Sequence, residues 1–163
     1  MIESPEVVID TSVLVGLIDS KDAWHDDAWA LRNALKAAQA RLVYFDCVVN
    51  EAVSVLARRA KERKHVDQYR DLLERLSSQV PQESITWISV AIKGLYRQIM
   101  DLVRETSGDL NFHDALIASC CRDLGLTWIA TFDSDFDQIT WLKRLYNPEG
   151  VEEAFQKPKE EET

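Results

Sequence analysis

The chain has 163 residues, of which 46% are hydrophobic and 29% are charged. This composition is that of a single globular domain and excludes a disordered chain, and the length makes disulfides or a structural metal unnecessary for folding. The net charge of -9 disfavours nonspecific binding to nucleic acid or to an anionic membrane, and no apolar run is long enough to cross a bilayer.

Apolar residues alternate along the chain between β-branched runs and helical spacing. Each β-branched run predicts a short strand, and each stretch of helical spacing predicts an amphipathic helix. The expected strands lie at residues 6–9, 41–45, 84–88 and 126–131, with a last edge strand near 141–146. The expected helices lie at residues 13–18, 23–40, 47–63, 65–78 and 90–106, and a further helix begins after Asn111.

This alternation predicts the fold class. It is typical of an α/β protein, here a three-layer α/β/α sandwich whose central sheet is mostly parallel. No repeat or linker divides the chain, so we expect a single domain over residues 1–147. Residues 148–163 are expected to form an acidic, flexible tail.

The three cysteines predict no disulfide framework, because Cys120 and Cys121 are neighbours and Cys47 is the only other thiol. Free thiols fit the reducing cytoplasm. No secretory signal is expected at the N-terminus, which reaches a buried strand within a few residues.

The first candidate functional residue lies at the end of the first strand. The apolar run stops at Asp10, and Thr11 and Ser12 follow it. Ligands of open α/β sheets bind beyond the carboxyl ends of the strands, so Asp10 is expected to point into that crevice. Taken alone, Asp10 has an equally ordinary interpretation as a turn residue, and either hydroxyl could cap the next helix.

Further carboxylates occupy comparable positions. Asp133 and Asp135 follow the fourth strand, and Glu51 falls in the first turn of a helix. Asp114 shares an apolar helix face, where a charge is costly unless it is paired or bound to a cation, and the neighbouring His113 is expected to point elsewhere. Capping and the helix dipole are ordinary alternatives for each of these acids taken singly.

Together these acids predict a metal site. Strand ends and helix starts lie on one edge of a parallel sheet, so the carboxylates can converge there. Converging carboxylates repel one another, and a hard cation such as Mg²⁺ or Mn²⁺ relieves the repulsion, whereas no Cys/His spacing indicates zinc. One or two such ions could bind a phosphate oxygen, activate a water and stabilise the leaving oxygen in phosphodiester hydrolysis.

Four stretches of the chain resemble the motifs of the PIN-domain family and, within it, of the small VapC-type toxin ribonucleases. In chain order they are VVIDTSVLVGLID, VVNEAVSVLARR, NFHDALIASCC and IATFDSDFDQI, and the resemblance spans about residues 7–146. It implies a PIN-like fold with a set of metal-binding acids, namely Asp10, Glu51, Asp114 and Asp133, with Asp135 as an accessory acid. It also implies hydroxyls that hold a carboxylate, a water or a phosphate, namely Thr11, Ser12 and Thr131.

The resemblance further implies an activity and its partners. The implied protein is an endoribonuclease that depends on one or two Mg²⁺ or Mn²⁺ ions and acts on RNA. By family analogy it is a homodimer that a small antitoxin protein holds inactive. A run of basic residues could steer RNA phosphates, although such runs are commonly just solvated helix faces; the run comprises Arg58, Arg59, Lys61, Arg63 and Lys64.

Three alternatives stay open beside the toxin ribonuclease. The first is a non-catalytic PIN-fold module that binds RNA or protein, which would be expected to lack one of the four acids. The second is an RNA-processing nuclease outside toxin–antitoxin systems. The third is an aspartyl phosphatase, which usually needs a second aspartate two positions after the first, where this chain has Ser12.

Overall fold

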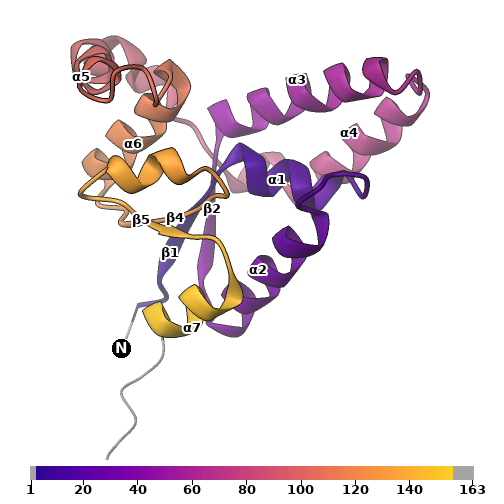
Figure 1. Cartoon of the computed structure of the whole chain (residues 1–163), viewed down its shortest axis with the longest axis horizontal. Coiled ribbons are helices and arrows are strands. Elements are labelled where there is room, and N and C mark those ends of the chain that lie inside the picture. The colour runs from indigo at the N-terminus through magenta and orange to yellow at the C-terminus, as the bar shows by residue number, and fades with distance from the viewer. Residues whose placement is uncertain (1–2, 156–163) are drawn as a thin grey trace, which may run out of the picture.

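The computed structural model describes residues 3–155 as an α/β fold around one five-stranded sheet (Figure 1). All strand pairs are parallel, and the strand order is β3-β2-β1-β4-β5. The strands are β1 (Glu6–Ile9), β2 (Arg41–Phe45), β3 (Ile85–Thr86), β4 (Trp128–Ala130) and β5 (Lys143–Leu145). The predicted α/β sandwich with a parallel sheet is therefore confirmed.

The central strand is β1, which is hydrogen-bonded on both sides. Val8 lies opposite Val43 of β2 and opposite Ile129 of β4. Val7 and Val8 are fully buried because helices cover both faces of the sheet. The strand that carries Asp10 at its end is therefore held rigidly within the core.

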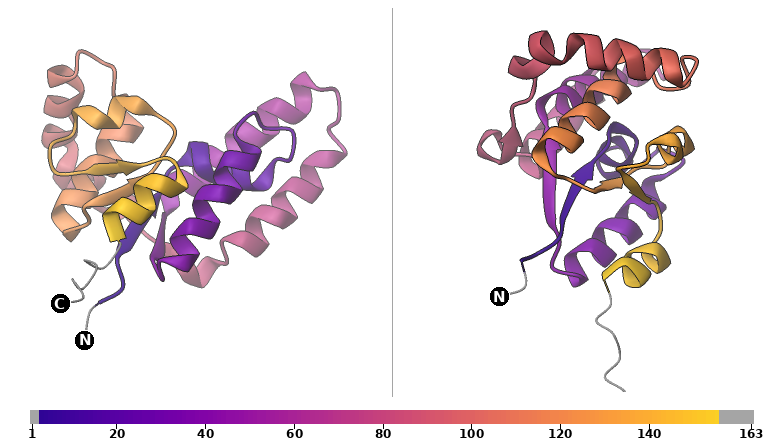
Figure 2. Two further views of the ribbon diagram at one scale, coloured as in Figure 1. Left: turned by 60° about the horizontal axis from the view of Figure 1, so that its bottom comes forward. Right: turned by 90° about the vertical axis from the view of Figure 1, so that its left-hand side faces the viewer.

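The helices form two layers. Helix α1 packs against α2, α3 and α4, and α7 packs against α2, whereas α5 and α6 pair with each other on the opposite side of the sheet (Figure 2). Strands β2 and β3 are added on one side of β1, and β4 and β5 on its other side. Because parallel strands are joined by right-handed crossovers, this change of side puts α5 and α6 on the face opposite to α1–α4. The helices are α1 (Thr11–Ile18), α2 (His25–Ala37), α3 (Asp46–Glu62), α4 (Gln68–Gln79), α5 (Ile92–Glu105), α6 (Phe112–Leu124) and α7 (Pro148–Phe155).

The third strand is shorter than the prediction of residues 84–88. Short 3₁₀ turns flank it, at Gln82–Ser84 and Ser89–Ala91. The buried side chain of Asp46 accepts hydrogen bonds from the backbone N–H groups of Ile88, at 2.8 Å, and Ser89, at 3.2 Å. These bonds draw the chain away from the sheet edge, so β3 ends at Thr86.

The predicted tail at residues 148–163 is wrong in its first half, because Pro148–Phe155 forms α7. Val151 is buried, and the Phe155 ring packs edge-on against Trp128 with centroids 5.1 Å apart. Asn147 precedes the helix and accepts a hydrogen bond from the backbone N–H of Gly150 at 2.8 Å. Residues 156–163 lie outside the described part of the chain.

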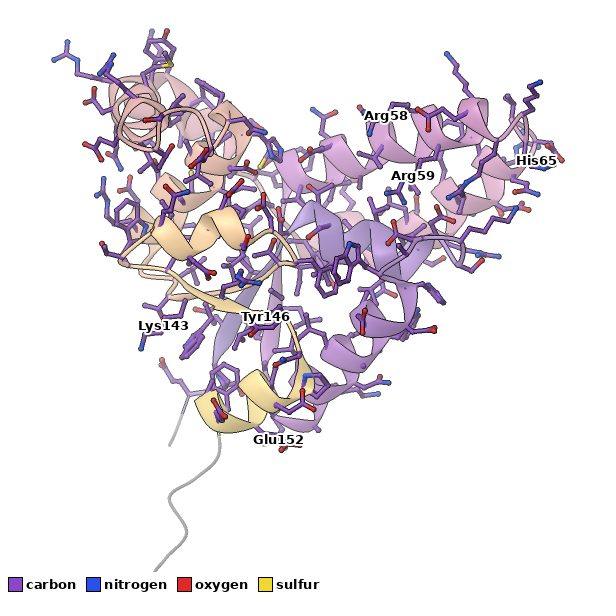
Figure 3. All side chains as sticks on the ribbon, viewed as in Figure 1. Arg58, Arg59, His65, Lys143, Tyr146 and Glu152 are labelled. Carbon is purple, nitrogen blue, oxygen red and sulfur yellow. The ribbon has the colours of Figure 1, made fainter. Side chains whose placement is uncertain are left out.

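Within residues 3–155, none of the helices combines the length and apolar character that a membrane span requires. The longest, α3, carries basic residues along its second half and extends with α4 away from the sheet. Figure 3 shows His65 at the far end of this helical pair.

Candidate active site

A pocket of about 330 Å³ brings together four of the predicted acids from separate elements. It lies at the carboxyl edge of the sheet, where α/β proteins bind their ligands. The acids that line it are Asp10 after β1, Glu51 on α3, Asp114 on α6 and Asp133 after β4. Thr11 and Ser12 also line this pocket, which we call the acid pocket.

Hydroxyl groups hold Asp10 in place. Thr131 donates a 2.7 Å hydrogen bond to Asp10 Oδ2, and Ser12 lies 3.4 Å from the same oxygen. Each hydroxyl also accepts a backbone N–H, from Asp133 at 3.0 Å for Thr131 and from Phe132 at 3.1 Å for Ser12. The ends of β1 and β4 are therefore joined through side chains as well as through the strand ladder.

Glu51 is held by residues from two other elements. Thr11 donates to Glu51 Oε2 at 2.8 Å, and His113 Nδ1 lies 3.0 Å from the same oxygen as a close ion pair. The contact with His113, followed by the bond from Thr11, outweighs burial and holds the pKa of Glu51 below its usual value. Glu51 is thus ionised at neutral pH.

His113 was predicted to point away from the acids, and this prediction is wrong. Its Nε2 lies 2.8 Å from the carbonyl oxygen of Cys47, one helical turn before Glu51. Burial lowers the pKa of His113, but its bonds to Cys47 and Glu51 outweigh burial and raise the pKa to about 11. The imidazolium is therefore a fixed positive charge behind Glu51.

Asp114 carries a carboxyl group whose charged form is disfavoured by its surroundings. Its backbone N–H donates to the side chain of Asn111 at 2.9 Å, so Asn111 caps the helix that was predicted to begin after it. Burial, followed by the charges of Asp10 and Asp133, raises the pKa of Asp114 to about 7. Burial also raises the pKa of Asp10, against the opposing hydrogen bond from Thr131.

Asp135 is not among the residues that line the acid pocket. Its backbone N–H donates to Asp133 Oδ1 at 2.9 Å, so Asp133 caps the 3₁₀ turn Ser134–Gln138. The charge of Asp133 raises the pKa of Asp135. Asp135 is therefore a neighbour of the pocket, and any direct role needs its side chain to turn inward.

The acid pocket fits a hard divalent cation by its chemistry. Its acids offer only oxygen ligands, and after burial, which is the main cause, the neighbouring carboxylates contribute to the raised pKa values of Asp10 and Asp114. As placed in residues 3–155, no three His, Cys, Asp or Glu side chains stand close enough to ligate one ion together. Direct ligation of one ion by three of these carboxylates would require them to rotate toward one another, whereas Mg²⁺ commonly keeps several waters and uses one or two carboxylates.

The basic run on α3 divides into two groups. Arg63 pairs with the buried Asp19 at 2.9 Å, and Arg59 pairs with Asp19 at 3.4 Å and with Asp22. These two arginines fasten α3 to the loop that follows α1. Arg58 is exposed, lines the acid pocket and lies beside Arg59 on α3 in Figure 3.

The two lysines of the run neither pair with Asp19 nor line the acid pocket. Lys61 and Lys64 are exposed and do not line the acid pocket. The sequence pattern placed all five basic residues in one group, whereas in the structure only Arg58 and Arg59 of the run line the acid pocket, and Arg59 is already paired with Asp19 and Asp22.

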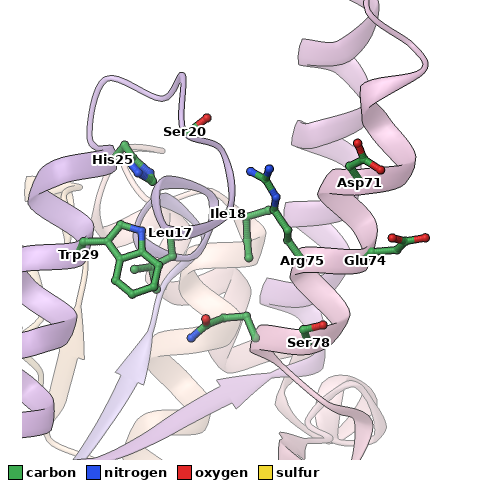
Figure 4. A pocket seen from close by; sticks show the side chains of 10 residues that line it. Leu17, Ile18, Ser20, His25, Trp29, Asp71, Glu74, Arg75 and Ser78 are labelled. Carbon is green, nitrogen blue, oxygen red and sulfur yellow. The ribbon is translucent and has the colours of Figure 1, made fainter.

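A larger pocket of about 800 Å³ lies between α2 and α4 (Figure 4). Leu17 and Ile18 of α1, Trp29 of α2, and Glu74 and Arg75 of α4 line it. It has no residue in common with the acid pocket, and its acids come from α4 alone.

Comparisons with known proteins agree with this fold. A family model described as PIN domain matches residues 7–142. The structure is similar to VapC20 of Mycobacterium tuberculosis, a toxin that cleaves the Sarcin-Ricin loop, with a TM-score of 0.63, 21% identity, and coverage of 83% of this chain and 96% of that one. It is also similar to VapBC2 from Rickettsia felis bound to a DNA fragment from their promoter, with a TM-score of 0.61, 17% identity, and coverage of 86% and 97%. No curated protein matched the sequence.

Proposed function

Because the chain belongs to the PIN domain family, we propose that it is a metal-dependent endoribonuclease that hydrolyses RNA phosphodiester bonds. The observation that carries the proposal is the convergence of Asp10, Glu51, Asp114 and Asp133 in one pocket. PIN domains are typically metal-dependent nucleases, and this chain retains an acid in each of its four motifs. That retention disfavours a non-catalytic module.

Each acid has a distinct place in this chemistry. Asp10, Asp114 and Asp133 would hold one or two Mg²⁺ or Mn²⁺ ions. The metal supplies charge stabilisation at the phosphate and a more acidic bound water. Glu51, kept ionised by His113 and Thr11, would bind one ion or orient the attacking water.

Arg58 at the rim contributes a positive charge that can contact an RNA phosphate. Its ion pair with Glu62, at 3.9 Å, is exposed and weak, so the guanidinium is free to move. Arg59 and Arg63 are already engaged by Asp19, so we assign them to the scaffold and not to RNA. Lys61 lies further along α3 and Lys64 lies just beyond its end, where an extended RNA would be needed to reach them.

Metal titration tests the proposed function. Wild-type protein incubated with a mixed RNA pool should cleave it in Mg²⁺ or Mn²⁺. It should not cleave it in a chelator, because the carboxylates alone do not stabilise the negative charge that develops on the phosphate. The measurement is the appearance of new RNA ends by sequencing across the titration. Cleavage that persists in chelator, or none at any metal concentration, would contradict the proposal and favour a binding module.

Thr131→Val is expected to raise the Mg²⁺ concentration for half-maximal cleavage about 10- to 100-fold, as loss of a bond to a metal ligand commonly does. Valine has the same shape but removes the 2.7 Å bond that holds Asp10. Thr131→Ser keeps the hydroxyl and is the matched control. An unchanged Mg²⁺ dependence in Thr131→Val would show that Asp10 does not bind the ion.

We also propose partners by likeness to the VapC proteins. The VapBC2 relative was solved on a DNA fragment from its own promoter. By this likeness we propose that the chain is the toxin of a toxin–antitoxin pair, that it forms a homodimer, and that a small antitoxin inhibits it. The three free cysteines fit a reducing cytoplasm.

A further inference from the structure

Two aromatic rings are stacked at the rim of the acid pocket. The rings of Trp24 and Phe132 lie 4.7 Å apart, centroid to centroid, with 12° between their planes. Trp24 lines the same pocket as Glu51 and Asp114, and it remains 49% exposed although it is the largest type of side chain. Phe132 covers one face of the indole, yet about half of the Trp24 residue remains exposed.

The backbone of Trp24 is fixed although its ring is exposed. Its N–H donates to Asp22 Oδ1 at 2.8 Å, and the other carboxylate oxygen of Asp22 pairs with Arg59. Helix α1 approaches closely at Gly16, where an added Cβ would lie 3.2 Å from the Trp24 carbonyl oxygen and 2.9 Å from Ala28 Cβ. The ring is thus presented to solvent from a rigid base.

Phe132 is equally well fixed, and it is joined directly to the acids. Its N–H donates to Ser12 Oγ at 3.1 Å, and Asp133 is the next residue. Phe132 is half-buried and packs against the core, so it anchors the exposed Trp24 ring at a set position beside the carboxylates.

We propose that Trp24, backed by Phe132, is a stacking platform for a nucleobase next to the phosphate in the acid pocket. This inference rests on the proposed action on RNA and specifies how RNA binds. Every base has an aromatic face, and stacking on a protein aromatic ring is a common source of affinity for single strands. A stacked base must be unpaired, so the platform selects single-stranded segments or loops.

The charge of the protein supports this mode of binding. Proteins that bind nucleic acid through phosphates carry clusters of cations, and their affinity falls steeply with salt. This chain has a net charge of -9, and two arginines line its acid pocket, of which Arg59 is paired with Asp19 and Asp22. Stacking supplies affinity that does not depend on positive charge, so binding should depend only weakly on salt.

The test uses binding of a labelled single-stranded oligoribonucleotide to Asp114→Asn protein, which is not expected to cleave it. Adding Trp24→Ala should weaken binding about 5- to 100-fold, the range usual for loss of one base–aromatic stack, whereas Trp24→Phe should restore most of it. Tyr146→Ala is the matched control, because Tyr146 is 48% exposed and lines a different pocket. For an oligonucleotide that lacks the base at the stacked position, Trp24→Ala and its parent should bind with equal affinity.

Equal affinity of Trp24→Ala and its parent for the intact oligonucleotide would overturn the platform. So would an equal loss on the abasic oligonucleotide, or a change in oligomeric mass without RNA, which would assign the ring to a protein interface. If wild-type protein cleaves RNA and Trp24→Ala binds normally, the platform fails and the nuclease stands. If wild-type protein does not cleave but Trp24→Ala weakens binding, the platform stands and the nuclease fails.

Discussion

Asp114→Asn is expected to lower metal-dependent RNA cleavage about a thousand-fold while the protein stays folded. The substitution removes one anionic side chain from the pocket, keeps its size, and leaves intact the helix cap, in which the Asn111 side chain accepts from the backbone N–H of residue 114. A bound metal supplies several kcal/mol at the transition state, and loss of about 4 kcal/mol is a thousand-fold in rate. The measurement is the single-turnover rate at saturating RNA and Mg²⁺.

Asp123→Asn is the matched control, because Asp123 lies on the same helix, is exposed and does not line the acid pocket. It should cleave at the wild-type rate. Cleavage by Asp114→Asn at the wild-type rate would contradict the assignment of Asp114 as a metal ligand.

The thermal stability of the metal-free protein provides a folding control for Asp114→Asn. Burial and the charges of Asp10 and Asp133 raise the pKa of Asp114 to about 7, so the wild-type fold loses stability as the pH rises from about 4 through 7. Asparagine removes that cost, and the variant should melt about 3 °C or more above wild type at pH 8 but not at pH 4. A clearly lower melting temperature at pH 8 would mean that Asp114 is a structural residue.

The double substitution Arg59→Met/Arg63→Met is expected to lower the free energy of unfolding by about 3 kcal/mol at pH 7. Both arginines contact Asp19, whose carboxylate is buried at the end of α1, so the variant leaves that charge without a cation. Urea denaturation measures the change. Arg58→Met/Lys61→Met removes the same charge from exposed positions of α3 and should change the free energy of unfolding by less than about 1 kcal/mol.

The pH dependence of the double variant follows from Asp19. Burial favours a higher pKa for Asp19, but the backbone N–H of Lys21 and the two guanidiniums outweigh it and hold the pKa below its usual value. A lowered pKa gives stability that is present above about pH 4 and is lost as the pH falls further. The difference between wild type and the double variant should therefore shrink toward pH 3, and a constant difference would contradict this role for Asp19.

The elements that sequence predicted well are those that local chemistry determines. The strand that ends at Asp10 follows from a β-branched run with no competing helical spacing. The start of α6 follows from Asn111, whose side chain caps the helix in the structure. Because parallel strands bring their carboxyl ends to one edge, the convergence of the four acids also followed from the order of the elements.

The elements that sequence missed depend on contacts between distant segments. The His113–Glu51 pair forms only when α6 docks against α3, and no spacing in either helix indicates it. The division of the basic run likewise depends on where Asp19 lies beside α3. Helix α7 did have a local signal, because an asparagine at 147 followed by Pro148 is a common helix start, but the acidic composition concealed it.

The pairing of β1 with β4 determines when activity can first arise during synthesis. Asp10 and the Thr131 that holds it are 121 positions apart, and Asp133 comes later still. A chain that is still emerging from the ribosome lacks these partners until β4 has been made, so its acid pocket is incomplete. Under the proposed function, the growing chain is therefore unable to cut the messenger RNA that encodes it until nearly the whole domain has been translated.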